Sequence, residues 1–215
     1  MRNLSATALV TGLRDALARD LPGHEGFLAM AGWRTEAIEE ARRRDGTPRE
    51  SAVLVLLHPA ENTVRTTLIV RPHYEGVHSG QVAFPGGRRE AGDKDMQATA
   101  LRETEEEIGV PGRSVEVIGT LSTLYIPPSR SLVTPHVGWL AAPPTYTPDA
   151  HEVAEVFEVP LEELMDPAAL GRTQRYIQIV DSHTSVPCFK LRGHEVWGAT
   201  AMILWELREL LLRVR

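Results

Sequence analysis

Apolar positions along the chain follow helical spacing in some stretches and strand-like runs in others, which predicts an α/β protein. Helices are predicted at residues 4–19, 34–44, 95–108, 161–165 and 198–213. Strands are predicted at residues 53–57 and 64–70, just before the glycine pair at 86–87, and near 115–123, 132–141, 153–159, 174–180 and 186–191. Strands outnumber helices, so we expect a mixed sheet covered by helices on both faces. Residues 1–46 are expected to form an N-terminal helical extension, and residues 47–215 one domain.

Two residues with potentially reactive side chains are assigned structural roles. His58 lies in a stretch with turn chemistry, residues 58–62, and is expected to be solvated or to cap a neighbouring element. Cys188 lies in an apolar run and is expected to be buried. As the only cysteine it has no partner for an internal disulfide, which points to a reducing compartment.

Composition and charge exclude several classes of function. The formal net charge of −6 argues against general nucleic-acid binding. No apolar run reaches the roughly 18 residues that a membrane helix needs. The first ten residues do not resemble a secretory signal, so the cytoplasm is the expected location. An anionic substrate would have to be held locally, by metal ions and a few basic groups.

The predicted helix at 95–108 carries three carboxylates on one side. Glu103, Glu106 and Glu107 stand at i, i+3 and i+4, which brings their side chains together. A solvated acidic face is one interpretation, because residues 105–107 are consecutive acids. A site for a hard divalent cation is the other, since carboxylate oxygens are the ligands that Mg²⁺ and Mn²⁺ prefer.

The segment 86–110 resembles the Nudix box, G-x5-E-x7-R-E-U-x-E-E-x-G-U, where U is aliphatic. Its second half matches at Arg102, Glu103, Glu106, Glu107, Gly109 and Val110. Thr104 replaces one aliphatic residue, on the side of the helix expected to be buried. In the first half the expected Glu falls on Lys94, and Asp93 is the nearest substitute, in a loop one residue longer than usual.

Residues ahead of the box are similar to one branch of this family, the coenzyme A diphosphatases. Arg71, His78 and Gly80 keep the spacing of that branch and lead into Phe-Pro-Gly-Gly at 84–87. An arginine usual between the first two is replaced here by Glu75 or Gly76. If that arginine holds the 3′-phosphate of coenzyme A, a substitute is needed. The basic residues available are His73, Arg88, Arg89 and Arg130.

The resemblance implies a Nudix fold, α/β with a mixed sheet between helices, and metal-dependent hydrolysis of a diphosphate linkage with Mg²⁺ or Mn²⁺. The implied metal ligands are Glu103, Glu106, Glu107 and the carbonyl of Gly86. The implied catalytic residues are Glu103, Glu106 and Arg102, with Arg102 orienting a glutamate. The base is Glu103, Glu106 or a distal acid, for which Glu152 and Glu155 are candidates. Substrate contacts are expected from Arg71, His78, Gly80 and Gly87.

The implied substrate is coenzyme A or an acyl-coenzyme A, cleaved to adenosine 3′,5′-bisphosphate and 4′-phosphopantetheine or its acyl form. Alternatives are ADP-ribose, NADH, sugar nucleotides or nucleoside triphosphates, or a regulator that binds nucleotide without turnover. All three box glutamates are present, which favours an enzyme. No membrane or nucleic-acid partner is expected, and a homodimer is suggested by the family alone. Trp197 either stacks on an adenine or packs at the start of the last helix.

Overall fold

The computed structural model describes residues 5–31, 34–61, 63–73, 79–177 and 181–214. Its helices are α1 (Ala6–Leu17), α2 (Glu25–Ala31), α3 (Arg34–Asp45), α4 (Met96–Ile108), α5 (Leu161–Met165) and α6 (Gly198–Val214). Its strands are β1 (Arg49–Ala60), β2 (Thr63–Val70), β3 (Val82–Ala83), β4 (Gly86–Arg88), β5 (Glu116–Thr120), β6 (Leu124–Ile126), β7 (Ser131–Trp139), β8 (Glu155–Pro160), β9 (Leu170–Ile177), β10 (Ser182–Leu191) and β11 (His194–Trp197). Short 3₁₀ turns, including η2 (Pro127–Ser129), join some of them.

The strands form two sheets within the described residues. The larger has eight strands, with β3-β2-β1-β7-β5 as its main order and β4, β6 and β8 attached to β1, β7 and β2. Its centre is a parallel pair, β1 and β7, and its other pairs are antiparallel. The smaller sheet is antiparallel, in the order β11-β10-β9. The large sheet is therefore mixed, as predicted.

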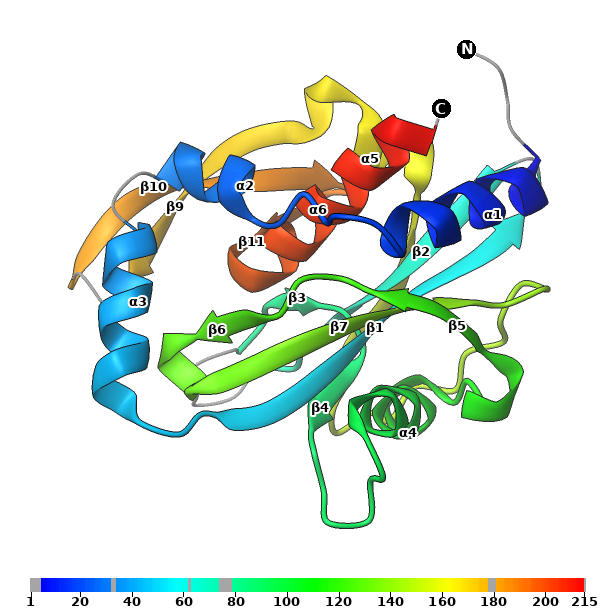
Figure 1. Ribbon diagram of the computed structural model, residues 1–215, viewed down its shortest axis with the longest axis horizontal. Coiled ribbons are helices and arrows are strands. Elements are labelled where there is room, and N and C mark those ends of the chain that lie inside the picture. The colour runs from blue at the N-terminus through cyan, green and yellow to red at the C-terminus, as the bar shows by residue number, and fades with distance from the viewer. Residues whose placement is uncertain (1–4, 32–33, 62, 74–78, 178–180, 215) are drawn as a thin grey trace.

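Helices cover both faces of the large sheet (Figure 1). Helix α4 lies against one face, where Ala100 and Ile108 pack on Leu54 and Leu56 of β1. Helices α1 and α6 lie on the other face and pack against each other. Successive side chains of β1 point to opposite faces of the sheet, and helices cover both faces, so β1 is buried on both sides. The α/β/α arrangement is thus confirmed.

The N-terminal segment contributes to the same core as the sheet. Leu13 and Leu17 of α1 and Phe27 of α2 are buried in the cluster that contains α6. A Phe27–Trp205 ring contact, with centroids 6.3 Å apart, ties α2 to α6. The division of the chain at residue 46 stays a prediction, but these described helices are not peripheral to the core.

Several local predictions need correction. Helix α2 and the strands β4, β6 and β11 were not predicted, because each is too short to show a period. The strand predicted just before the glycine pair at 86–87 is β3, and the pair itself lies inside β4, which pairs with β1. Strand β1 runs on to Ala60, so the predicted turn begins only at Glu61, which has φ 51°. Residue 4 of the first predicted helix and residues 178–180 of the predicted strand 174–180 lie outside the described residues.

His58 is not solvated, contrary to expectation. Its side chain is fully buried in β1, with Nε2 3.3 Å from Oε1 of Glu158 and 3.4 Å from the hydroxyl of Tyr146. Burial lowers the pKa of the His58 imidazole. Cys188 is buried as predicted, and burial raises the pKa of its thiol, which makes it a poor nucleophile.

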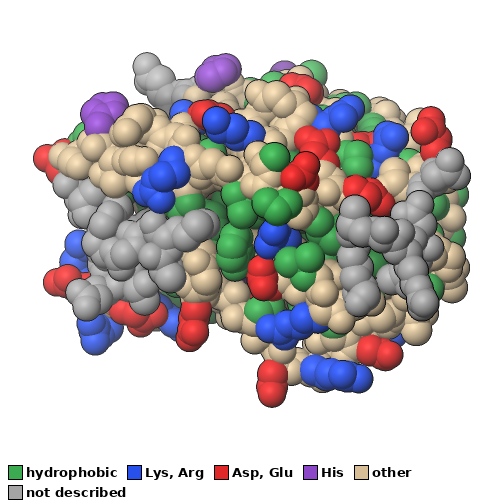
Figure 2. All heavy atoms as spheres, turned by 90° about the horizontal axis from the view of Figure 1, so that it is seen from above, with side chains coloured by type: hydrophobic (Ala, Val, Ile, Leu, Met, Phe, Trp, Pro, Cys, Tyr) green, Lys and Arg blue, Asp and Glu red, His purple; other side chains and the backbone are tan. Residues whose placement is uncertain are grey.

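Acidic and basic side chains are interspersed on the face seen in Figure 2, with hydrophobic side chains between them. Among the described helices, none is both long and apolar enough to cross a membrane.

Candidate active site

Helix α4 is capped at both ends. Asp95 caps its N-terminus by accepting a hydrogen bond from the Ala98 amide at 2.8 Å. Gly109 ends it in the left-handed conformation, with φ 73°. Thr104 is buried, and its hydroxyl donates to the Ala100 carbonyl at 2.7 Å, so a polar residue is accommodated at a position where an aliphatic one is usual.

Three carboxylates meet beside this helix. One oxygen of each of Glu103, Glu107 and Glu152 lies within 4.8 Å of the other two. Glu152 precedes β8 and is exposed, whereas Glu107 is buried. Three converging carboxylates repel one another unless protons or a cation lie between them, and all-oxygen donors suit Mg²⁺ or Mn²⁺. The donor set therefore fits a hard divalent cation.

Glu107 is the most constrained of the three. It is 1% exposed, its Oε2 accepts from the Gly86 amide at 2.8 Å, and its Oε1 lies 3.6 Å from the Arg71 guanidinium. Burial raises the pKa of Glu107 to about 7, although Arg71 and the Gly86 amide oppose the shift. Burial also raises the pKa of Glu103, against the opposing effect of Arg102. Both groups gain from a positive ion nearby.

Arg102 organises the acidic side of the site. Its Nε and Nη2 donate to the two oxygens of Asp93, each at 3.0 Å, and Nη2 also lies 3.0 Å from Oε1 of Glu103. Its Nη1 donates to Oε2 of Glu106 at 2.7 Å. One guanidinium thus links the preceding loop to two box glutamates.

Glycines are required where β4 passes the site. A Cβ on Gly86 would lie 2.3 Å from the Ala52 carbonyl oxygen, and the residue has φ 150°. A Cβ on Gly87 would lie 2.4 Å from Cδ of Glu103. Gly80 has φ 64°, and a Cβ there would lie 2.5 Å from Cε1 of the His73 ring. The first two glycines let the strand pass directly under the carboxylates.

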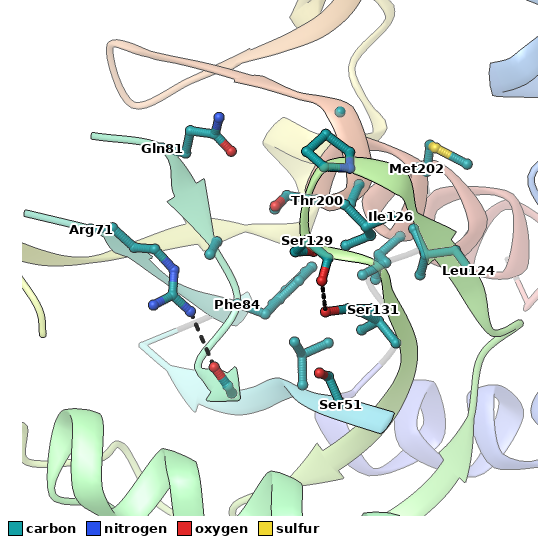
Figure 3. Close-up of a pocket in the computed structure, with 18 of the residues that line it drawn as sticks. Ser51, Arg71, Gln81, Phe84, Leu124, Ile126, Ser129, Ser131, Thr200 and Met202 are labelled. Atoms are coloured by element: carbon teal, nitrogen blue, oxygen red, sulfur yellow. Dashed lines mark hydrogen bonds between the residues drawn. The ribbon is translucent and has the colours of Figure 1, made fainter. Parts of the chain in front are cut away.

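The carboxylates lie in a cleft of about 800 Å³ between β4, β6 and the start of α6. Figure 3 shows Arg71 and Gln81 on one side of it and Leu124 and Met202 on the other. Trp197, just before α6, also lines the cleft, and the Arg175 guanidinium lies 5.5 Å from its ring centroid. A cleft of this size accommodates a small-molecule ligand.

The structure brings together most of the predicted site residues. Those lining the cleft are Arg71, Gly86, Gly87, Glu103 and Glu107. Glu106 points elsewhere: its side chain is 55% exposed and paired with Arg102, outside the group of three carboxylates. His78 lies outside the described residues, as do residues 74–77, where the branch's arginine is replaced. The assigned roles stay predictions.

Sequence reasoning placed Glu152 only as a candidate base, together with Glu155. In the structure Glu155 lies 3.4 Å from His194, and Glu152 reaches the helix carboxylates. No local motif marks Glu152, because it stands 45 positions after Glu107 in the chain. The apolar side of the cleft was also missed, since its residues come from separate elements.

The match to known proteins agrees with this geometry. A family model described as the NUDIX domain matches residues 48–179, so the chain belongs to the Nudix family. With the Nudix hydrolases among its relatives, it is a pyrophosphohydrolase.

Two relatives are informative. The uncharacterized Nudix hydrolase NudL of Pectobacterium atrosepticum is 37% identical over 169 residues, covering 74% of this chain and 81% of its own. The human mitochondrial coenzyme A diphosphatase NUDT8 is 34% identical over 159 residues, covering 73% of this chain and 66% of its own. These two similarities confirm that the chain resembles the coenzyme A diphosphatase branch. They leave its substrate open.

A solved structure supports the fold. The Nudix hydrolase RenU from M. smegmatis superposes with a TM-score of 0.55 at 19% identity, covering 78% of this chain and 88% of its own. At that identity the likeness concerns architecture alone.

Proposed function

We propose that this enzyme hydrolyses the diphosphate of coenzyme A or its thioesters, with Mg²⁺ or Mn²⁺ held by Glu103, Glu107 and Glu152. The observation that carries the proposal is a single cleft with these carboxylates on one side and apolar side chains on the other. Coenzyme A has matching parts, a charged diphosphate and a long, largely uncharged arm. The similarity to NUDT8 supports the same assignment.

The bound cation would neutralise diphosphate charge and lower the pKa of water. The chain's own residues do the rest. Arg71, whose Nη2 donates to the Gly86 carbonyl at 3.1 Å, fixes that strand and presents positive charge to the cleft. Arg102 positions Glu103. We assign the transfer of a proton from water to Glu103 or Glu152, and burial raises the pKa of Glu103, as suits a base.

Arg88 is our choice for the missing phosphate-binding arginine. Of the alternatives, Arg89 donates to Glu50 at 2.9 Å and Arg130 donates to the Asp45 carbonyl. Arg88 lines the cleft next to Gly87, and its guanidinium makes no ion pair within the part of the chain that the structure describes. An exposed guanidinium that lines the cleft suits a phosphate monoester.

Product analysis tests the proposal. Purified enzyme with Mg²⁺ or Mn²⁺ is given coenzyme A, dephospho-coenzyme A, ADP-ribose, NADH and nucleoside triphosphates in parallel. Preferential release of adenosine 3′,5′-bisphosphate from coenzyme A supports it. Faster cleavage of ADP-ribose, NADH or a triphosphate would keep the chemistry and overturn the substrate.

Arg88→Ala, with Arg89→Ala as the matched control, tests the phosphate contact. Arg88→Ala should raise KM for coenzyme A by about 10-fold or more, as expected for a lost charge-assisted contact. KM for dephospho-coenzyme A should change little. An equal rise for both compounds would reject a contact specific to the 3′-phosphate.

A further inference from the structure

The cleft is closed at its apolar end by residues from outside the matched Nudix segment. Ile38 belongs to α3, ahead of residues 48–179. It lines the cleft together with Leu124 and Tyr125 of β6 and Met202 of α6. Figure 3 places Leu124 and Met202 across the cleft from Arg71. Helix α3 thus contributes to the wall that lies opposite Arg71.

This wall is fixed to the rest of the molecule by polar contacts at the end of α3. The Tyr125 hydroxyl donates to Oδ2 of Asp45 at 2.8 Å, and Arg130 donates to the Asp45 carbonyl. Helix α3 contacts both β6 and η2. In Figure 1 α3 stands beside β6, at the edge of the two layers. These contacts hold the end of α3 against β6 and η2.

A second cavity lies behind the same wall. It has a volume of about 120 Å³ between α2, α3 and β6. Ile38, Leu124, Tyr125 and Met202 line both this cavity and the main cleft, so they separate the two. Beyond the wall, Leu28 and Leu132 give this cavity an apolar side, and its other lining residues are polar: His24, Glu39, Arg42 and Thr123. An apolar cavity of about 150 Å³ holds a six-carbon ring. At about 120 Å³ this smaller cavity has room for about four methylene groups on its apolar side.

The wall suits a hydrocarbon better than a nucleobase or a sugar. Leu124, Met202 and Ile38 offer no hydrogen bonds, and the Tyr125 hydroxyl is already engaged with Asp45. The Ser131 hydroxyl nearby donates to the Ser129 carbonyl. A base or ribose buried here would lose hydrogen bonds to water without replacement.

We infer that Ile38, Leu124, Tyr125 and Met202 limit the length of a linear acyl chain carried by the substrate, so that α3 of the N-terminal extension is a specificity element. The inference rests on the proposed function for the orientation of the substrate, with its diphosphate at the carboxylates. A smaller side chain in this wall should join the cleft to the second cavity and admit longer acyl chains. A larger side chain in the wall should exclude longer acyl chains.

The test uses full-length enzyme, since truncation would remove Leu13, Leu17 and Phe27 from the core. Acetyl-, butyryl-, octanoyl- and lauroyl-coenzyme A are compared for wild type, Met202→Ala and Ile38→Trp. Leu212→Ala, an exposed change on the same helix, is the control. Both kcat/KM with Mg²⁺ and binding by calorimetry with Ca²⁺ in place of Mg²⁺ are measured, so that the diphosphate is not opposed by bare carboxylates. Binding does not depend on turnover, so the binding affinities report on the wall even if no thioester is hydrolysed.

One buried methylene is worth about a fourfold change in affinity. Met202→Ala should therefore favour lauroyl over acetyl thioester by at least about 10-fold more than wild type does. Ile38→Trp should shift the preference the other way, and Leu212→Ala should leave it unchanged. Shifts in binding without hydrolysis of any thioester would support the wall and reject the proposed reaction. Chain-length profiles that coincide in all four proteins, or thioesters that do not bind, would overturn the inference.

Discussion

Asp93 and Arg102 form a two-point ion pair, with both carboxylate oxygens 3.0 Å from guanidinium nitrogens. Asp93 also accepts from the Glu90 amide and the Thr99 hydroxyl, each at 2.9 Å. The Arg102 guanidinium beside it holds the pKa of Asp93 well below its usual range. Asp93 therefore occupies, from a longer loop, the place next to Arg102 that the box's first glutamate would be expected to take.

Replacing Asp93 with Asn tests this relationship. An amide cannot accept both guanidinium bonds, so Arg102 should lose its orientation and position Glu103 less well. We expect kcat to fall by about 10- to 100-fold, as for other residues that orient metal ligands. Steady-state kinetics of Asp93→Asn and of Lys94→Gln measure it. Lys94 is the matched control, because its side chain is 82% exposed. A kcat within twofold of wild type in Asp93→Asn would contradict the orienting role.

Alanine substitutions at the two glycines of β4 should have different effects, one on stability and the other on turnover. In Gly86→Ala the new Cβ meets the Ala52 carbonyl, which is fixed backbone, so the protein should be destabilised by about 1–3 kcal/mol. In Gly87→Ala the Cβ meets the end of the Glu103 side chain, which can rotate away. That variant should keep its Tm and lose turnover. Thermal melts beside kcat measurements separate the two, and equal losses of Tm would refute the distinction.

The carboxylates of α4 should differ in their importance. Glu107→Gln removes a charge from the group of three, and metal-dependent kcat should fall by more than about 100-fold. The fold should persist, since Gln can still accept from the Gly86 amide. Glu152→Gln should also lose activity.

Glu106→Gln is the decisive comparison, because the sequence predicts a ligand there. If Glu106 binds the metal after leaving Arg102, its variant should match Glu107→Gln in both kcat and Mn²⁺ affinity. Calorimetric titration with Mn²⁺ measures that affinity. Near-normal values in Glu106→Gln would remove it from the site.

Glu206 should contribute stability that depends on pH. It is fully buried in α6 and accepts from the Gly23 amide at 3.0 Å and the Ser122 amide at 2.9 Å, with His24 3.4 Å away. Burial acts to raise its pKa, but the contacts with His24 and Ser122 outweigh it, so the pKa of Glu206 lies below its ordinary value. Glu206→Gln cannot satisfy every donor and should cost about 1–3 kcal/mol at neutral pH.

The pH dependence follows from the direction of the shift. A depressed pKa stabilises the fold above the unfolded value, about 4.3 for Glu, and the gain is lost as pH falls through the folded value. The difference in unfolding free energy between wild type and Glu206→Gln should thus be full near pH 7 and shrink below about pH 4. Urea melts at several pH values measure it. Glu209→Gln, a less buried change on the same helix, should show little difference at any pH.

Short-range sequence patterns were enough to predict the helix that carries the box. The helix at 95–108 and its 103-106-107 spacing are read directly from the sequence, because helical periodicity involves only near neighbours. The aliphatic runs of β1 and β2 were equally clear, since strands buried on both faces need unbroken hydrophobicity. Asp93 was predicted as the nearest substitute for the first glutamate of the box, and the structure supplied its partner, Arg102.

Tertiary structure decided everything that depends on distant segments. The burial of His58 could not be read from its turn-like neighbours, because Glu158 and Tyr146 arrive from later in the chain. The gathering of Glu152 with Glu103 and Glu107, and the wall shared by Ile38 and Met202, require the sheet and α6 to be in place. Sequence alone determined the helix and its charges, since those follow from short-range periodicity. The packed fold determined which charges meet and where the cleft ends, since proximity in space is set by long-range pairing.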